Sequence, residues 1–124
     1  RPEADTRWLV EKFLCLLGHS EKHIKFEVGR IDVTLIDATG KPWAIFEVKK
    51  SLDDKRDKDD GRRKGFDYAN KVGAHLVVLT DADRYDIYDN DKSGNYDEKL
   101  RGSFKLTHYK NADDGLLDML RPKA

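Results

Sequence analysis

The sequence predicts an α/β (α+β) fold in which helices flank a mixed central sheet. Three consecutive segments, residues 23–28, 30–37 and 43–49, have the alternation or the apolar run typical of strands. Residues 3–17 before them and 59–72 after them carry apolar side chains at helical spacing. The run GAHLVVLTD then follows, as expected of a strand buried on both faces. The predicted order is therefore α-β-β-β-α-β.

The first helix and the three strands follow from the spacing of their apolar residues. In residues 3–17 the apolar stripe has i, i+4, i+7 and i+8 spacing, before a natural stop at Gly18, and comprises Leu9, Phe13, Leu16 and Leu17. In each of the first two strands, alternation places three apolar side chains on one face: Ile24, Phe26 and Val28, then Ile31, Val33 and Leu35. Because the connections are short, we expect an antiparallel meander that ends on the strand WAIFEVK.

The second half of the chain begins with a charged segment. Residues 50–65, KSLDDKRDKDDGRRKG, are almost wholly charged, and we expect an exposed, mobile loop that anchors no core. It runs into the helix at 59–72, whose apolar residues are Phe66, Tyr68, Ala69 and Val72. After GAHLVVLTD, the segments RYDIYD and FKLTHY are expected to be two further strands, and GLLDML a short closing helix.

Length and composition bound the function. The 124 residues fit one domain, residues 1–124, with a single core. Lys and Arg number 24, as do Asp and Glu, so a polyanionic partner must be held by a local patch. The lone Cys15 fits a reducing, cytoplasmic setting. No apolar run approaches the roughly 20 residues that cross a bilayer, so no membrane partner is expected. The chain starts at Arg1, as in a domain excised from a larger protein or in a processed or tagged chain.

One constellation of charged residues could carry chemistry. Glu47 and Lys49 share a face of their strand, and Asp32 begins the neighbouring strand of the meander. Two carboxylates and an ammonium at a sheet edge can hold Mg²⁺ and stabilise charge on a phosphoryl group. The alternative is a surface ion pair between adjacent strands, since 39% of the residues are charged.

Two further features have equally plain structural explanations. Glu3 stands at the N-terminal end of the first helix, where it can be a metal ligand, a helix-dipole partner or the partner of Arg7. The basic residues of the charged segment suit a phosphate backbone, but interleaved aspartates dilute their field. In isolation that segment fits a solvated loop at least as well.

Other chemistries find little support. DNDKSGN, residues 89–95, mimics the start of a calcium loop, but Leu100 stands where a bidentate Glu is required, and a hairpin turn is expected instead. The four histidines lack zinc-ligand spacing, and neither a Gly-rich phosphate loop nor a serine nucleophile elbow is found.

In order, these pieces resemble the PD-(D/E)XK nuclease superfamily, and more narrowly the N-terminal nuclease domain of type I restriction enzyme motor (R) subunits. The motif residues are Glu3, the Asp32 of GRID, Glu47-Val48-Lys49 and a later helix with Tyr68. The phrases EADTR, WAIFEVKKS, DYANKVGAHLVVLTD and FKLTHY are similar to that family's, and the likeness covers roughly residues 3 to 110.

The resemblance implies a restriction-endonuclease-like core and Mg²⁺-dependent hydrolysis of DNA, with Mn²⁺ able to substitute. Asp32 and Glu47 would be metal ligands, with the Val48 carbonyl as a third, Glu3 as the first-helix acid and Lys49 as the catalytic lysine. DNA contacts would come from Lys50, Arg62, Arg63, Lys64 and Tyr68. The family's Gln-x-x-x-Tyr motif is altered here, because Lys64 stands at the glutamine position.

Three functions are consistent with these observations. The first is a DNA endonuclease, the cleavage module of a restriction or defence enzyme, fused to or associated with a helicase or translocase and a specificity module. The second is a catalytically inactive nucleic-acid-binding module on the same fold, which the Lys64 departure keeps open as an alternative. The third is an interaction domain whose charges are only surface.

Overall fold

The computed structural model describes residues 2–123, with side chains from residue 4 onward. The helices are α1 (Pro2–Leu16), α2 (Lys55–Val72), α3 (Tyr96–Lys99) and α4 (Asp114–Met119). The strands are β1 (Ile24–Val28), β2 (Ile31–Ile36), β3 (Pro42–Val48), β4 (Leu76–Thr80), β5 (Arg84–Asp89) and β6 (Leu100–Lys105). Short 3₁₀ turns occupy Glu21–His23, Leu106–His108 and Asn111–Asp113.

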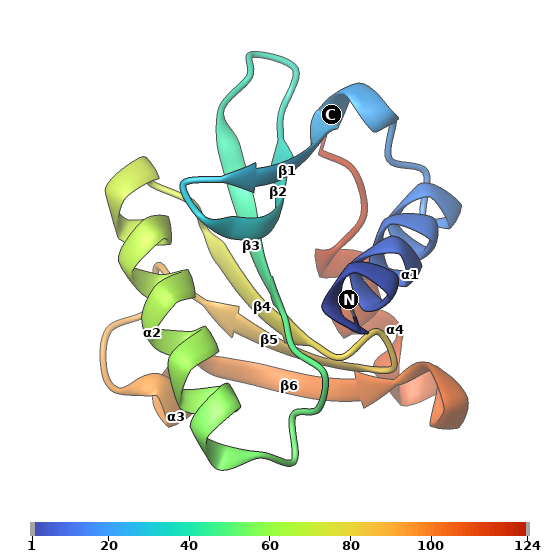
Figure 1. Ribbon diagram of the computed structural model, residues 1–124, viewed down its shortest axis with the longest axis vertical. Helices are drawn as coiled ribbons and strands as arrows, with labels where there is room; N and C mark the ends of the chain where they lie inside the picture. Colours follow the sequence, from blue (N-terminus) through green and yellow to red (C-terminus); the bar gives the residue numbers. More distant parts are fainter. Residues whose placement is uncertain (1, 124) are drawn as a thin grey trace.

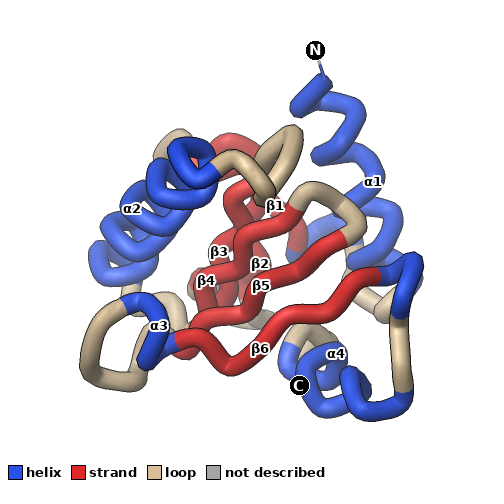
Figure 2. The backbone as a smooth tube through the Cα atoms, turned by 90° about the horizontal axis from the view of Figure 1, so that it is seen from below, coloured by secondary structure: helices blue, strands red, loops and turns tan. Residues whose placement is uncertain are grey.

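Within residues 2–123 the six strands form one mixed sheet, in the order β1-β2-β3-β4-β5-β6. Neighbours are antiparallel except β3 and β4, which are parallel and are joined by α2. Such a pair needs a crossover, and a helix supplies it. The helix α2 covers one face of the sheet, and α1 and α4 cover the other (Figures 1 and 2). The predicted mixed sheet, its flanking helices and the order α-β-β-β-α-β are confirmed.

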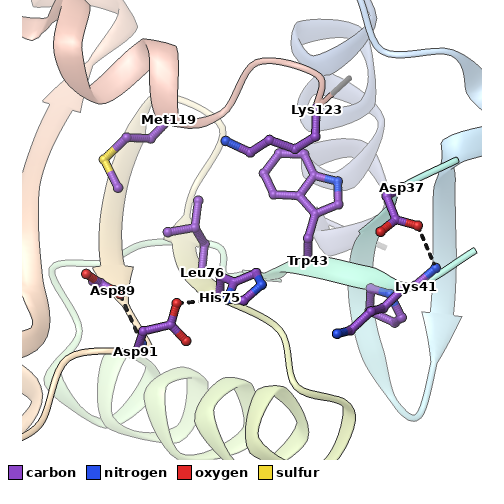
Figure 3. Close-up of a pocket in the computed structure, with 10 residues that line it drawn as sticks. Asp37, Lys41, Trp43, His75, Leu76, Asp89, Asp91, Met119 and Lys123 are labelled. Atoms are coloured by element: carbon purple, nitrogen blue, oxygen red, sulfur yellow. Dashed lines mark hydrogen bonds and ion pairs between the residues drawn. The ribbon is translucent and has the colours of Figure 1, made fainter. Parts of the chain in front are cut away.

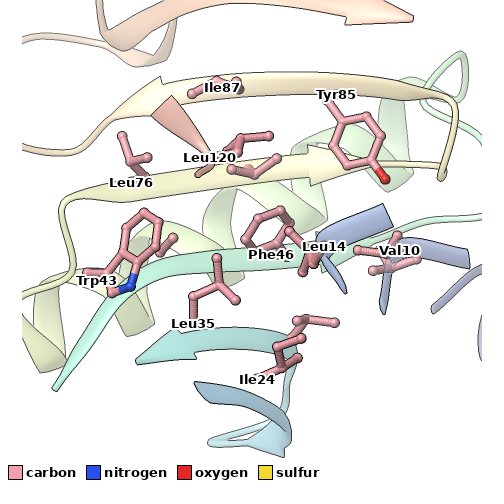
Figure 4. Packing of buried hydrophobic residues seen from close by; sticks show 14 of the residues in the cluster. Val10, Leu14, Ile24, Leu35, Trp43, Phe46, Leu76, Tyr85, Ile87 and Leu120 are labelled. Carbon is pink, nitrogen blue, oxygen red and sulfur yellow. The ribbon is translucent and has the colours of Figure 1, made fainter. Parts of the chain in front are cut away.

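The core has two layers because alternate side chains of β3 point to opposite faces. Phe46 belongs to the cluster beneath α1 and α4, together with Val10, Leu14 and Tyr85 (Figure 4). Ile45 belongs to the cluster beneath α2. Every residue of β4 is buried, as its continuous apolar run predicts.

The helix α1 buries a different stripe from the one its spacing predicts. Val10 and Leu14 are fully buried, whereas Leu9 is 51% exposed and Leu16 87% exposed. Phe13 packs against the cluster only in part. The helix carries two overlapping apolar stripes, and contact with β3 and β5 decides between them. Spacing within the helix alone could not make that choice.

The prediction of an exposed, mobile loop over residues 50–65 is also wrong, because most of this segment belongs to α2. The helix α2 begins at Lys55, where the Asp54 side chain caps it by accepting hydrogen bonds from the backbone N–H groups of Arg56 and Asp57. Leu52 is 3% exposed and anchors the segment in the core. The buried positions of the helix's first half are glycines, Gly61 and Gly65, so the segment has no apolar stripe to reveal a helix.

The C-terminal third departs from expectation at one element. The strand predicted from FKLTHY lies earlier, at Leu100–Lys105. The Asp83 carboxylate accepts hydrogen bonds from the backbone N–H and the hydroxyl of Thr107, both at 2.9 Å, where the chain leaves the sheet for a 3₁₀ turn. Residues 89–95 do connect antiparallel strands, with α3 inserted before β6.

Among the helices of residues 2–123, none combines the length and hydrophobicity that a membrane span requires.

Candidate functional site

Asp32 and Glu47 lie side by side where β2 begins and β3 ends. The register that pairs Val33 with Phe46 sets these two residues opposite each other when it is continued by one position. The Asp32 N–H donates to Glu47 Oε1 at 3.4 Å, and the Val48 N–H donates to Asp32 Oδ2 at 2.8 Å. Each carboxylate is therefore tied to the other's strand. The predicted proximity of Asp32 to Glu47 is confirmed.

Glu47 is a buried acid in a polar setting. Only 2% of the residue is exposed, and α2 covers it, with Gly65 close to its side chain. Burial raises the pKa of Glu47 to about 7, and the neighbouring Asp32 charge adds to the rise, while Lys49 opposes it. Near neutral pH this carboxyl group therefore exchanges between its protonated and ionised forms, and a bound cation would favour the ionised form.

Lys49 lies on the same face as Glu47 and is held from the helix side. Its Nζ is 2.9 Å from Asp60 Oδ2, and its side chain is 12% exposed. Burial alone would lower the pKa of Lys49, but the Asp60 hydrogen bond and the surrounding carboxylates outweigh it and raise the pKa. The lysine is therefore a cation in this site.

These residues open into one pocket of about 400 Å³ between the sheet end and α2. Its lining comprises Glu27, Arg30, Asp32, Glu47, Val48, Lys49 and Lys64. Sequence reasoning missed Glu27, near the end of β1, and Arg30, in the turn between β1 and β2. Arg30 has a positive φ of 66°, uncommon for arginine. The Gly29-Arg30 pair at the start of GRID could have indicated this, because a tight turn there keeps its side chains close to Asp32 at the start of β2.

Of the predicted DNA-contacting residues, Lys64 alone lines this pocket within residues 4–123. Lys50 is exposed next to Lys49, and Arg63 is exposed while paired with Asp60. Arg62 instead lies over the Tyr96 ring, 5.0 Å from its centroid, and pairs with Asp59. The structure does not bring Arg62 to the pocket.

Tyr68 and Glu3 are two further positions of the motif, and Tyr68 is not among the residues that line this pocket in the described chain. The Tyr68 ring packs against the β1–β2 turn so closely that a Cβ on Gly29 would meet it at 2.2 Å. Glu3 lies in the first turn of α1, and its side chain is outside the described residues.

The donor set suits a hard cation. Among the residues that the structure describes, no group of three or more His, Cys, Asp or Glu side chains is arranged to hold a metal ion. The Asp32 and Glu47 carboxylates line the same pocket and influence each other electrostatically, and Mg²⁺ is commonly bound through one or two carboxylates plus water. Their chemistry therefore fits Mg²⁺ without a third acidic side chain.

A second pocket, of about 470 Å³, lies at the opposite end of β3 (Figure 3). Trp43 and Leu76 line it, with Lys123 over the indole and His75 bonded to Asp91 at 2.7 Å. Its acidic residues are engaged: Asp37 caps its own turn, and Asp91 holds His75. Unlike the pocket around Glu47, this pocket has no buried acid among its lining residues in the described chain.

Comparisons of the chain with protein-family models, with curated proteins and with solved structures found no match.

Proposed function

We propose that this chain is a Mg²⁺-dependent DNA endonuclease domain of the PD-(D/E)XK type. The observation that carries the proposal is the meeting of Asp32, Glu47 and Lys49 in one pocket at the end of the sheet. A chance surface ion pair would leave its charges in water, whereas Glu47 is buried with a raised pKa. Burying an acid beside another carboxylate is costly, and a bound cation would offset that cost.

Each residue has a role in hydrolysis, which adds water across one P–O bond of the backbone. Asp32 and Glu47 would hold Mg²⁺, with the Val48 carbonyl and Glu3 as the further ligands that the resemblance implies. A bound Mg²⁺ supplies Lewis-acid stabilisation of the phosphate's negative charge. The Lys49 ammonium borders the same pocket, where it can orient the attacking water or stabilise charge in the transition state.

Cations around the pocket would hold the DNA backbone. Arg30 and Lys64 enter it from opposite elements, the β1–β2 turn and α2. Lys50 and Arg63 are exposed nearby in sequence and can contact further phosphates. Recognition of a specific sequence would belong to an associated specificity module, and movement along DNA to a fused or associated helicase or translocase, in the cytoplasm.

A second candidate is an inactive DNA-binding module. Lys64 at the glutamine position keeps this candidate open, because it departs from the family's motif while its ammonium can still contact phosphate. Such a module would bind DNA with steep salt dependence and show no metal-dependent turnover.

Conversion of supercoiled plasmid to nicked or linear forms, with Mg²⁺ and with a chelator, separates the two functions. We expect cleavage only with Mg²⁺ or Mn²⁺. Binding without cleavage at any metal concentration would instead support the inactive module.

A further inference from the structure

Three cationic side chains, two of which line the pocket, converge on the carboxylate of Asp60. Asp60 Oδ2 is 2.9 Å from the Nζ of Lys49 and 3.4 Å from that of Lys64, and Asp60 Oδ1 is 2.7 Å from Arg63 Nη2. The Asp60 side chain is 32% exposed, so these contacts are partly shielded from water. Asp60 is one of five aspartates in the charged segment, and its sequence context does not single it out.

The glycines of α2 explain how a helix residue reaches a strand lysine. A Cβ at Gly61 would lie 3.1 Å from Leu79 Cδ2 and 3.3 Å from Lys49 Cε. A Cβ at Gly65 would lie 2.8 Å from Val77 Cγ1. Larger residues at these positions would push α2 away from the sheet. The close approach brings Asp60 within hydrogen-bond distance of Lys49.

Asp60 and Lys49 differ in their relation to the pocket. Lys49 is part of the pocket lining, whereas Asp60 is not among the lining residues of the described chain. The carboxylate therefore holds the ammonium from outside the pocket. Lys64, in contrast, both borders the pocket and contacts Asp60.

We propose that Asp60 is a positioning residue that fixes the Lys49 ammonium at the pocket wall, ready to face a scissile phosphate. Its catalytic consequence rests on the proposed nuclease function, while the anchoring itself does not. A lysine side chain has many rotamers, and charge-assisted hydrogen bonds select one of them. Without Asp60, the ammonium is free to turn toward Asp32 and Glu47 and to compete there with a cation.

The consequence is a specific kinetic change. Misplacing a reacting group by about 1 Å can cost on the order of 100-fold in rate. We expect Asp60→Ala, which removes the acceptor, to lower kcat roughly 10- to 100-fold while KM for DNA changes less than about twofold. Asp60→Glu, which keeps the charge, should recover part of the loss. Asp67→Ala removes the same side chain from an exposed position of the same helix and is the matched control.

The hydrogen bond between the Lys49 ammonium and Asp60 is measured independently by ¹H–¹⁵N spectra of lysine ammonium groups. A hydrogen-bonded ammonium exchanges its protons with water slowly and therefore gives a signal. We expect a Lys49 signal, assigned by its loss in Lys49→Met, in the wild type and in Asp67→Ala but not in Asp60→Ala. Loss of that signal together with the fall in kcat supports the proposal. An unchanged signal in Asp60→Ala, or unchanged kcat despite its loss, overturns it. A wild type that never cleaves DNA overturns the nuclease function and the catalytic role, and the spectra still decide the anchoring.

Discussion

Asp32 and Glu47 hold each other's strands: the Asp32 carboxylate accepts the Val48 N–H, and the Glu47 carboxylate accepts the Asp32 N–H. This arrangement places the buried Glu47 beside the partly buried Asp32, and the pKa of Glu47 rises to about 7. A fold selected only for stability would avoid such a pair, since burial and like charge both disfavour it. The pair is therefore the observation that most directly supports the proposed cation site.

The raised pKa of Glu47 predicts how stability depends on pH in the absence of metal. Between pH 4.5 and 7 the folded chain retains the Glu47 proton while the unfolded chain releases it. The free energy of unfolding therefore falls as pH rises through this window, by about 3 kcal/mol at most. Urea denaturation at several pH values, compared between wild type and Glu47→Gln, measures this contribution. The variant should lose that part of the pH dependence, and identical curves for both proteins would contradict the assignment.

Metal binding should stabilise the folded chain through the same pair. At ten times its Kd, Mg²⁺ adds about 1.4 kcal/mol to the free energy of unfolding, or roughly 3–6 °C in Tm. The effect should be larger at pH 8 than at pH 6, because Glu47 must lose its proton to bind. Thermal scans of wild type and Asp32→Ala check this. An equal Mg²⁺ shift in Asp32→Ala would place the cation elsewhere.

Substitution of Leu52 tests whether residues 50–65 pack into the folded core. Leu52→Ala removes a side chain that is 3% exposed, and it should lower the free energy of unfolding by about 2–4 kcal/mol. Leu16→Ala makes the same chemical change at a position that is 87% exposed, and should cost less than about 0.5 kcal/mol. Chemical denaturation compares the two. Equal small effects would mean that the segment does not pack in solution.

Arg30 and Lys64 should bind phosphate, and salt dependence measures such contacts. The logarithm of the DNA-binding constant falls linearly with the logarithm of the salt concentration, and each lost phosphate contact reduces the steepness of this line by about 0.9. Binding of duplex DNA in a chelator should therefore show a shallower slope for Arg30→Ala and for Lys64→Ala than for wild type. Lys71→Ala, on the exposed far end of α2, serves as the control. A slope unchanged in both pocket variants would exclude these side chains from the interface.

Much of the sheet was predictable because its strands carry their pattern locally. The alternation in β2 and the apolar run of β4 each identify a strand, and the adjacency of Asp32 and Glu47 follows from the short turn between their strands. The roles of these residues in catalysis come from the motif resemblance and stay predictions.

The remaining features depend on contacts between elements. The first half of α2 buries Gly61 and Gly65 rather than apolar side chains, so hydrophobic periodicity could not detect it. The buried stripe of α1 was misassigned because the sheet, and not the helix, selects Val10 and Leu14 over Leu9 and Leu16. Asp60 was not identified because only the packed helix brings it to Lys49.

Plasmid cleavage by Lys49→Ala tests the central claim most directly, with Lys71→Ala as the matched loss of one positive charge. Lys49→Ala should remain folded, because Asp60 keeps Arg63 and Lys64 as partners, and it should still bind DNA. We expect its Mg²⁺-dependent cleavage to fall at least about 100-fold, while Lys71→Ala cleaves like the wild type. Cleavage by Lys49→Ala at the wild-type rate would contradict the assignment of this pocket as a nuclease site.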